Sequence, residues 1–296
     1  MSVKWREMSN HVFQTIEKLL TTSSTAVLYL DIGDFWQKES DPSFHASLAS
    51  LVDSSERKSV TQFRFRRDAA AHLISLLLQH LVIASIAHVA FDQTFITRKP
   101  DGRGKPVPSS GDFAKLLDYN VSHHGGRVAI GIDVTSDVRP ACIGIDLVDL
   151  NTAGLAIVDD FRDIFSLSER IAIKTHVDPV LQHRYLFSFW ALKEAFTKAI
   201  GTGLTADLLA IQFSNVPLLS ESCMYSDSAK CHFHADLLAW KFQLYFLENC
   251  FILAVATPTS KLLCHTSTSV ERILLPDLLS SVSVDIPRPT TTSDAD

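Results

Sequence analysis

One short stretch of the chain combines a carboxylate, two ammonium groups and a large aromatic ring at helical spacing. Residues 187–201 read FSFWALKEAFTKAIG, which predicts an amphipathic helix that ends at a glycine. Trp190, Glu194 and Lys198 are four residues apart and therefore share one face of this helix. Glu194 can hold a cation, whereas Lys198 and the neighbouring Lys193 can hold an anion. This combination suits a phosphate group that is bridged to a divalent metal ion.

A strand predicted at residues 142–148 carries a second candidate carboxylate. Side chains alternate between the two faces of a strand, so Asp146 and Val148 point one way and Asp149 points the other. A carboxylate in an apolar strand is costly to bury unless it is paired or binds a metal ion. Asp146 could join Glu194 around Mg²⁺, which prefers one or two carboxylates with waters and phosphate oxygens. A turn cap or an ion pair with a lysine explains Asp146 equally well at this point.

Further polar groups lie where a predicted strand, residues 118–122, ends in a tight turn. Asn120 and Ser122 share a face of this strand, and His123 and His124 follow at its tip. Their donors could reach a phosphate, although a hydrogen-bonded hairpin turn is the more usual role of such residues. The sequence contains no Walker loop, no G-x-G-x-x-G fingerprint after a strand and no G-x-S-x-G elbow.

The elements that must position these residues alternate between strands and helices. Helices are predicted at 66–89, 166–176 and 179–200, and strands at 26–32, 118–122, 128–134, 142–148, 210–213, 231–237, 240–247 and 251–256. This order predicts an α+β fold of two similar, pseudo-twofold-related lobes, each with a small antiparallel sheet packed on a long helix. We assign residues 1–139 to the N-terminal lobe, 140–284 to the C-terminal lobe, and 285–296 to a disordered tail.

Bulk composition narrows the possible partners. The chain has 296 residues and a net charge of −6, so bulk charge does not favour binding to nucleic acid. Its five cysteines form no C-x-x-C pair, which indicates reduced thiols and a cytoplasmic protein. The N-terminus lacks the apolar core of a signal peptide, and polar residues interrupt the most apolar stretch, residues 73–91. We therefore expect a buried helix there, and neither a membrane nor a nucleic acid as a partner.

Four short motifs along the chain point to a known family. They are GKP at 104–106, NVSH at 120–123, GID at 144–146 and WALKEAFTK at 190–198. In this order they resemble the 4′-phosphopantetheinyl transferase family, of the longer, Sfp-like kind. Residues 199–204 resemble its eukaryotic members, of the aminoadipate-semialdehyde-dehydrogenase-phosphopantetheinyl-transferase type. Residues 63–69 and 273–282 add to a similarity that spans about residues 25 to 282.

The resemblance implies an activity and a reaction centre. Family members transfer the 4′-phosphopantetheine arm of coenzyme A to a serine of a carrier protein and release adenosine 3′,5′-bisphosphate. By this resemblance, Asp146 and Glu194 bind Mg²⁺ at the pyrophosphate, and Glu194 also acts as the general base. Lys198 would hold a phosphate oxygen, with Lys193 nearby.

The resemblance also implies how the rest of coenzyme A is held, in the cleft between the two lobes. Lys105, Ser122 and His123 would face the 3′-phosphate and the adenosine. Arg98 corresponds to the basic residue that precedes the GKP motif. Arg57 would supply the positive charge that relatives carry two residues further along the chain.

Three positions depart from the family pattern. Val148 replaces a glutamate found in many bacterial relatives, which leaves one metal ligand position to water. Ser59 stands where relatives have a basic residue, and Ser75-Leu76 replaces a Gly-Arg pair. These changes keep open the alternative of a degenerate homologue that binds coenzyme A or carrier proteins without turnover.

The expected partners are acyl or peptidyl carrier protein domains. Fatty-acid, polyketide, peptide-synthetase and aminoadipate-reductase carriers are all compatible with the sequence. Because carrier proteins are commonly acidic, we expect a basic or apolar docking patch beside the cleft despite the net charge of −6. Two lobes in one chain make a monomer sufficient.

Overall fold

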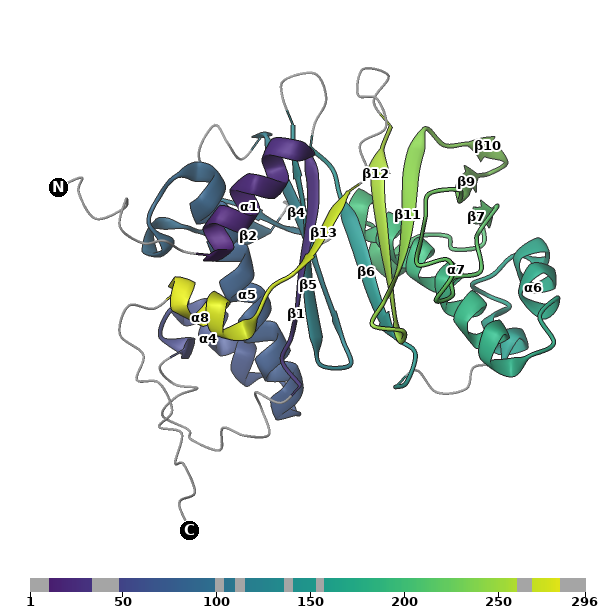
Figure 1. Ribbon diagram of the computed structural model, residues 1–296, viewed down its shortest axis with the longest axis horizontal. Coiled ribbons are helices and arrows are strands. Elements are labelled where there is room, and N and C mark those ends of the chain that lie inside the picture. The colour runs from purple at the N-terminus through teal and green to yellow at the C-terminus, as the bar shows by residue number, and fades with distance from the viewer. Residues whose placement is uncertain are drawn as a thin grey trace, which may run out of the picture.

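The computed structural model describes residues 11–33, 48–98, 104–109, 115–135, 141–152, 157–259 and 268–282. Two lobes lie side by side, each with a sheet and a long helix (Figure 1). The α+β class predicted from the sequence is confirmed. The predicted disordered tail, residues 285–296, lies outside the described residues.

The N-terminal lobe is built on a four-stranded sheet in the order β13-β1-β5-β4. These strands are β1 (Thr25–Asp31), β4 (Leu117–His124), β5 (Arg127–Val134) and β13 (Ser269–Arg272). The lobe's helices are α1 (His11–Thr22), α4 (Ser54–Thr61), α5 (Arg66–Ala87) and α8 (Leu275–Val282). A two-stranded ribbon of β2 (Ile96–Arg98) and β3 (Pro106–Pro108) follows a short 3₁₀ turn, η1 (Phe91–Gln93).

The C-terminal lobe has a four-stranded sheet in the order β6-β12-β11-β8. The strands are β6 (Gly144–Asp149), β8 (Tyr225–Ser226), β11 (Trp240–Leu247) and β12 (Phe251–Pro258). Helix α7 (Pro179–Ile200) packs across β6 and β12, with α6 (Leu167–Lys174) beside it. The remaining elements are η3 (Val158–Phe161), η4 (Gly203–Thr205), β7 (Ile211–Ser214), β9 (Lys230–Phe233) and β10 (Asp236–Leu237).

The end of the chain returns to the N-terminal lobe. Strand β13 pairs in parallel with β1, and α8 contacts α1 and α5 (Figure 1). The sequence-based division had placed this segment in the C-terminal lobe, because a single break near residue 139 takes no account of a returning strand. The described part of the chain thus crosses between the lobes twice.

The strand predicted at 231–237 is a hairpin instead. Strands β9 and β10 pair antiparallel across a turn in which His234 and Ala235 have positive φ values of 47° and 74°. Such values are uncommon for residues other than glycine, and the sequence has no Gly, Pro, Asn or Ser there to indicate a turn. The alternation of polar and apolar residues continues through the turn, so it predicted one strand where the chain reverses direction.

Helix α5 is the core of the N-terminal lobe. It is long and apolar enough to span a membrane by length and composition, but 83% of its most apolar window is buried inside the protein. Its apolar side chains belong to one large cluster with those of α1, β1 and β5. The expectation of a buried helix is confirmed.

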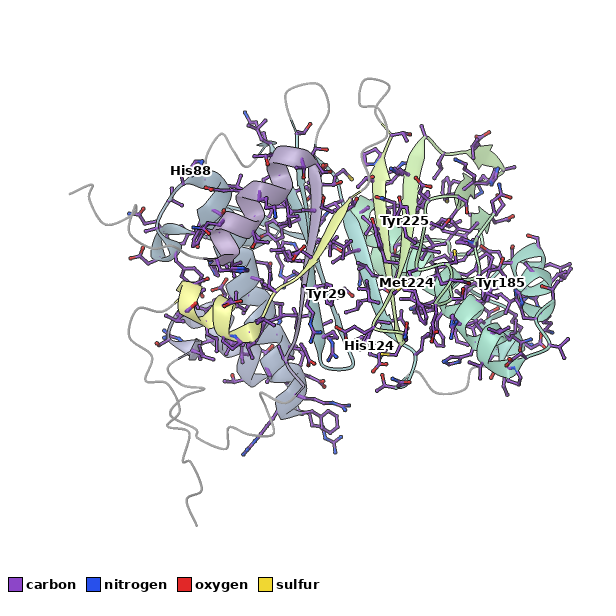
Figure 2. All side chains as sticks on the ribbon, viewed as in Figure 1. Tyr29, His88, His124, Tyr185, Met224 and Tyr225 are labelled. Carbon is purple, nitrogen blue, oxygen red and sulfur yellow. The ribbon has the colours of Figure 1, made fainter. Side chains whose placement is uncertain are left out.

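The two sheets meet along β4 and β6 through side chains rather than through paired backbones. Four alternate side chains of β4 accept hydrogen bonds from alternate backbone N–H groups of β6 and of Ile143, the residue before it. The pairs are Asp118 with Ile143 (2.8 Å), Asn120 with Ile145 (2.9 Å), Ser122 with Leu147 (3.1 Å) and His124 with Asp149 (3.1 Å). We call this arrangement the β4–β6 ladder. His124, at one end of it, lies between the lobes in Figure 2.

Candidate active site

A cleft of about 790 Å³ opens between the lobes next to the β4–β6 ladder. Its walls come from α4, α5, β2, β4, β6 and α7, so both lobes contribute side chains. From helix α7 the lining includes Phe187, Trp190 and Lys198. The ring of Trp190 is held edge-on against Phe161 of η3, with 6.1 Å between ring centroids. The face of α7 predicted to carry chemistry therefore borders the cleft.

Close packing of β6 on α7 brings Asp146 to this face. Gly144 lies so near the backbone of Ala195 and Ala199 that a Cβ atom there would overlap with it. Only glycine allows this approach, and it sets the distance between strand and helix. Two residues further along β6, Asp146 points toward the same helix, as the strand alternation predicted.

Asp146, Ser122 and Lys198 form a compact polar cluster. The Nζ atom of Lys198 donates to Asp146 Oδ1 at 2.6 Å and to Ser122 Oγ at 3.1 Å. Ser122 donates in turn to Asp146 Oδ1 at 3.1 Å, while its oxygen accepts from the backbone of Leu147. Asp146 is only 6% exposed, so the lysine supplies the positive charge that this buried carboxylate requires. Ser122 joins the ladder to the site.

Glu194 completes the site with an unsatisfied carboxylate. Its Oε1 atom is buried and accepts no hydrogen bond from the described residues. Burial raises the pKa of Glu194, and the neighbouring Asp146 raises it further, while Lys198 opposes the shift. Two carboxylates that repel each other beside an unpartnered oxygen are a suitable site for a divalent cation.

The donor set fits Mg²⁺ as a site with two carboxylates. Among the described residues, no group of three or more His, Cys, Asp or Glu side chains is arranged to hold a metal ion. Val148, which lines the cleft two residues after Asp146, is an apolar and buried neighbour. The remaining positions around an ion bound by Asp146 and Glu194 would fall to water and substrate oxygens, which is the ligation Mg²⁺ favours.

Basic groups gather in the part of the cleft lined by α5 and β2. His72, Arg98 and His123 line it, and the Nε2 atom of His72 lies 2.8 Å from Ser59 Oγ. Burial lowers the pKa of His72, and the positive charges of His123 and Arg98 lower it further. Burial, followed by Lys198, likewise lowers the pKa of His123. A bound anion would offset the repulsion between the positive charges of these basic groups.

Three of the predicted binding residues lie elsewhere. Lys193 is buried, where it pairs with Glu169 at 3.0 Å and donates to backbone carbonyls of Leu208 and Ile211. It is one residue from Glu194, which turns it about 100° around the helix, toward the core rather than toward the cleft. The prediction that Lys193 lies near the phosphate is therefore wrong, because its ammonium group points into the core.

Lys105 and Arg57 also differ from their expected positions. Lys105 is buried, donating to Asp118 at 2.5 Å and to the carbonyl of Ile143 at 2.7 Å, so it braces the two lobes. Arg57 is exposed on α4 and does not line the cleft. Arg98 does line it, with one guanidinium nitrogen donating to the carbonyl of Gly104.

Sequence reasoning missed the contribution of α5 to the cleft. His72, Ser75, Leu76 and Gln79 all line it. They recur at intervals of three and four residues, which places them on one face of the helix. Polar residues at this spacing on an otherwise apolar helix were the available signal, but Ser75 and Leu76 were considered as a departure from the family pattern, Ser75 and Gln79 as interruptions of a membrane span, and His72 not at all.

Comparison with known proteins agrees with this geometry. Residues 36–134 match the family model of the 4′-phosphopantetheinyl transferase N-terminal domain, and residues 142–252 match that of the 4′-phosphopantetheinyl transferase superfamily. The L-aminoadipate-semialdehyde dehydrogenase-phosphopantetheinyl transferase of Xenopus laevis is 27% identical over 228 residues, which cover 75% of this chain and 73% of that protein.

Two further similarities have different coverage. The 4′-phosphopantetheinyl transferase 1 of Fusarium mangiferae is 33% identical over 180 residues, covering 54% of this chain and 60% of that protein. A solved holo-(acyl-carrier-protein) synthase from Bacillus anthracis aligns with a TM-score of 0.29 and 22% identity, over 40% of this chain and 96% of its own. Because the two family models follow one another and together match more than two thirds of the sequence, the chain belongs to the 4′-phosphopantetheinyl transferase family.

Proposed function

We propose that the cleft binds coenzyme A and that the protein transfers its 4′-phosphopantetheine arm to a serine of a carrier protein. The observation that carries this proposal is the meeting of Asp146 and Lys198 in a cleft of about 790 Å³ at the junction of the lobes, with Glu194 close enough to interact electrostatically with both. A volume of this size suits a nucleotide-sized ligand. The basic groups of α5 and β2 offer a second position for negative charge.

Asp146 and Glu194 are the residues that would hold Mg²⁺. When bound, Mg²⁺ would neutralise pyrophosphate charge and polarise the phosphorus that is attacked. Lys198 already neutralises Asp146 at 2.6 Å, so its ammonium group competes with a metal ion for this carboxylate. Turned toward the substrate, the same group would stabilise a phosphate oxygen during transfer.

Glu194 is suited to accept the proton of the carrier serine. Its raised pKa makes it a stronger base than an exposed glutamate, and its buried Oε1 atom has no hydrogen-bond partner among the described residues. The serine oxygen forms a bond to the phosphorus that carries the pantetheine arm, and the bond to the bridging oxygen breaks. Adenosine 3′,5′-bisphosphate leaves with that oxygen, and the serine proton passes to Glu194.

The carrier class is the finer part of the proposal. The names of several relatives point to L-aminoadipate-semialdehyde dehydrogenase as the target of those proteins, which makes a reductase carrier domain the first candidate here. Fatty-acid, polyketide and peptide-synthetase carriers remain candidates. The cytoplasmic location and the monomeric state expected from the sequence stay predictions.

The test is a transfer reaction with purified components. The protein, coenzyme A, Mg²⁺ and an apo carrier domain are incubated, and the carrier is weighed by intact mass spectrometry. The expected result is a gain of one phosphopantetheine arm and the release of adenosine 3′,5′-bisphosphate. Asp146→Asn should reduce the rate by about 10²–10³-fold, a loss typical of removing one transition-state contact.

Asp149→Asn is the matched control, because Asp149 lies three residues away on β6, its side chain accepts local hydrogen bonds from residues 151 and 152, and asparagine keeps the backbone N–H that bonds to His124. Its rate should stay close to that of the wild type. Tight binding of coenzyme A in calorimetry with no mass gain on any of the four carrier classes would overturn the transfer proposal. That outcome would favour a protein that binds coenzyme A without turnover.

A further inference from the structure

The segment Phe63–Arg67, which joins α4 to the first turn of α5, is strongly basic in an acidic protein. Residues 57–67 include five cationic side chains and no Asp or Glu, whereas the whole chain has a net charge of −6. Every residue of the segment is exposed. A concentration of one charge sign that opposes the charge of the whole protein attracts partners of the opposite sign.

The same segment exposes two aromatic rings. Phe63 is 39% and Phe65 is 54% accessible to solvent. The guanidinium groups of Arg64 and Arg67 lie 5.5 and 5.9 Å from the centre of the Phe65 ring, so the ring is held among cations. Aromatic residues, including phenylalanine, and arginine are enriched in protein interfaces relative to the rest of the surface.

Local structure accounts for only part of these residues, since Arg67 lies 3.5 Å from Asp68 in the same helical turn. Phe65 is the N-cap of α5 and provides no side-chain hydrogen bond there, although Ser, Thr, Asp or Asn would do so. Arg66 and Arg67 occupy the first turn of the helix, where its dipole disfavours positive charge. Three consecutive residues are therefore unfavourable for the helix that they begin. A role outside the fold explains their presence better than a role within it.

The segment adjoins the active-site cleft. The ring of Phe63 packs on His72, with 5.0 Å between centroids, and His72 lines that cleft. Phe63 and Arg67 also line a second cavity of about 870 Å³, which shares His123 and His124 with the cleft. A protein seated on the segment would thus contact the N-terminal lobe beside the cleft that holds Asp146.

We propose that Phe63–Arg67 is a docking surface for the acidic face of a carrier domain, an inference that rests on the function proposed above. The arginines attract the carboxylates of the carrier, and Phe65 supplies the apolar anchor at the centre of their contact. Because the surface lies outside the cleft, it governs the affinity for the carrier without changing the affinity for coenzyme A.

Steady-state transfer to an apo acyl carrier protein tests this surface. The triple variant Arg64→Gln/Arg66→Gln/Arg67→Gln should raise the KM for the carrier roughly tenfold or more, since exposed ion pairs are individually weak but three are lost together. The KM for coenzyme A should stay unchanged. High salt should raise the wild-type KM for the carrier and affect the variant much less. The control Lys18→Gln/Lys115→Gln/Lys230→Gln removes the same charge from exposed positions elsewhere.

Phe65→Ser separates docking from folding. Serine at the N-cap should leave the unfolding midpoint unchanged or raise it, whereas the KM for the carrier should rise by roughly tenfold through loss of the anchor. An unchanged KM for the carrier in both segment variants, with an active wild-type enzyme, would overturn the docking surface and leave the transfer function standing. No transfer by the wild type overturns the function itself. Loss of binding to a labelled single-stranded oligonucleotide, with carrier kinetics unchanged, would instead identify a nucleic-acid surface and refute the proposal.

Discussion

Replacing Glu194 with glutamine should stabilise the metal-free protein at neutral pH. Burial and Asp146 raise the pKa of Glu194, so the folded state holds this proton more tightly than the unfolded chain does. The wild type therefore loses stability as the pH rises from the ordinary glutamate value of 4.5 to the raised value, and the loss persists above it. Glutamine does not titrate, so the variant avoids this loss.

The magnitude follows from the surroundings of one oxygen atom. Oε1 of Glu194 is buried without a partner among the described residues, a situation that costs about 1–3 kcal/mol. In the wild type, Lys198 offsets part of the Glu194 charge, and in the variant the glutamine amide still carries part of the cost of burying a polar group. The variant should therefore gain about 1 kcal/mol in the free energy of unfolding. For a protein of this size, that gain corresponds to a rise of about 2 °C in the midpoint of thermal unfolding.

Differential scanning calorimetry in EDTA measures this difference directly. The gap between Glu194→Gln and the wild type should close as the pH falls toward 4.5, and Glu17→Gln on the exposed face of α1 should show no gap. Mg²⁺ with coenzyme A should raise the wild-type midpoint and raise the variant midpoint much less. A variant that is less stable than the wild type in EDTA at pH 7.5, or that gains equally from Mg²⁺, would refute the reasoning.

Three further predictions concern other parts of the site. Lys198→Met should lower kcat by about 10²–10³-fold, measured by release of adenosine 3′,5′-bisphosphate, because the transferred phosphate loses a preorganised charge; a normal kcat would contradict the role of Lys198. The pKa of His72 is lowered from 6.5, so this side chain becomes positively charged only in acid. The preference for coenzyme A over its 3′-dephospho form, measured by calorimetry, should therefore grow as the pH falls from 7.5 to 5.5. In His72→Gln this preference should grow less. Asn120→Ala leaves the buried N–H of Ile145 without its 2.9 Å acceptor and should cost about 1–3 kcal/mol in urea unfolding, while Asn120→Asp, which keeps an acceptor, should cost less.

Local periodicity was sufficient to predict the helix and the strand that carry the candidate site residues. Helix α7 begins and ends where its pattern indicated, because a proline lies in its first turn and Gly201 takes the left-handed conformation that ends it. The alternation along β6 correctly directed Asp146 toward α7. These features depend on residues within one or two turns of each other, which is the range over which a sequence pattern is informative.

The lysines were harder to predict because their partners are distant in sequence. Lys193 is drawn into the core by Glu169 of α6, and Lys105 by Asp118 of β4. Nothing in the neighbourhood of either lysine indicates these pairings, since a buried carboxylate looks the same in sequence as an exposed one. The return of β13 to β1 was missed for the same reason, as it joins segments separated by more than two hundred residues.

The β4–β6 ladder also limits how the two halves of the protein can move. A shift of β4 by one residue would present Tyr119 and Val121 to the N–H groups of β6 and leave buried donors without acceptors. A shift by two would restore acceptors but carry Ser122 away from Asp146. The lobes therefore have one permitted alignment along β4 and β6, and a shift of one lobe past the other by either one or two residues is unfavourable. On the function proposed above, carriers of different shape would be accommodated by the outer surface, while the ladder keeps Ser122 aligned with Asp146.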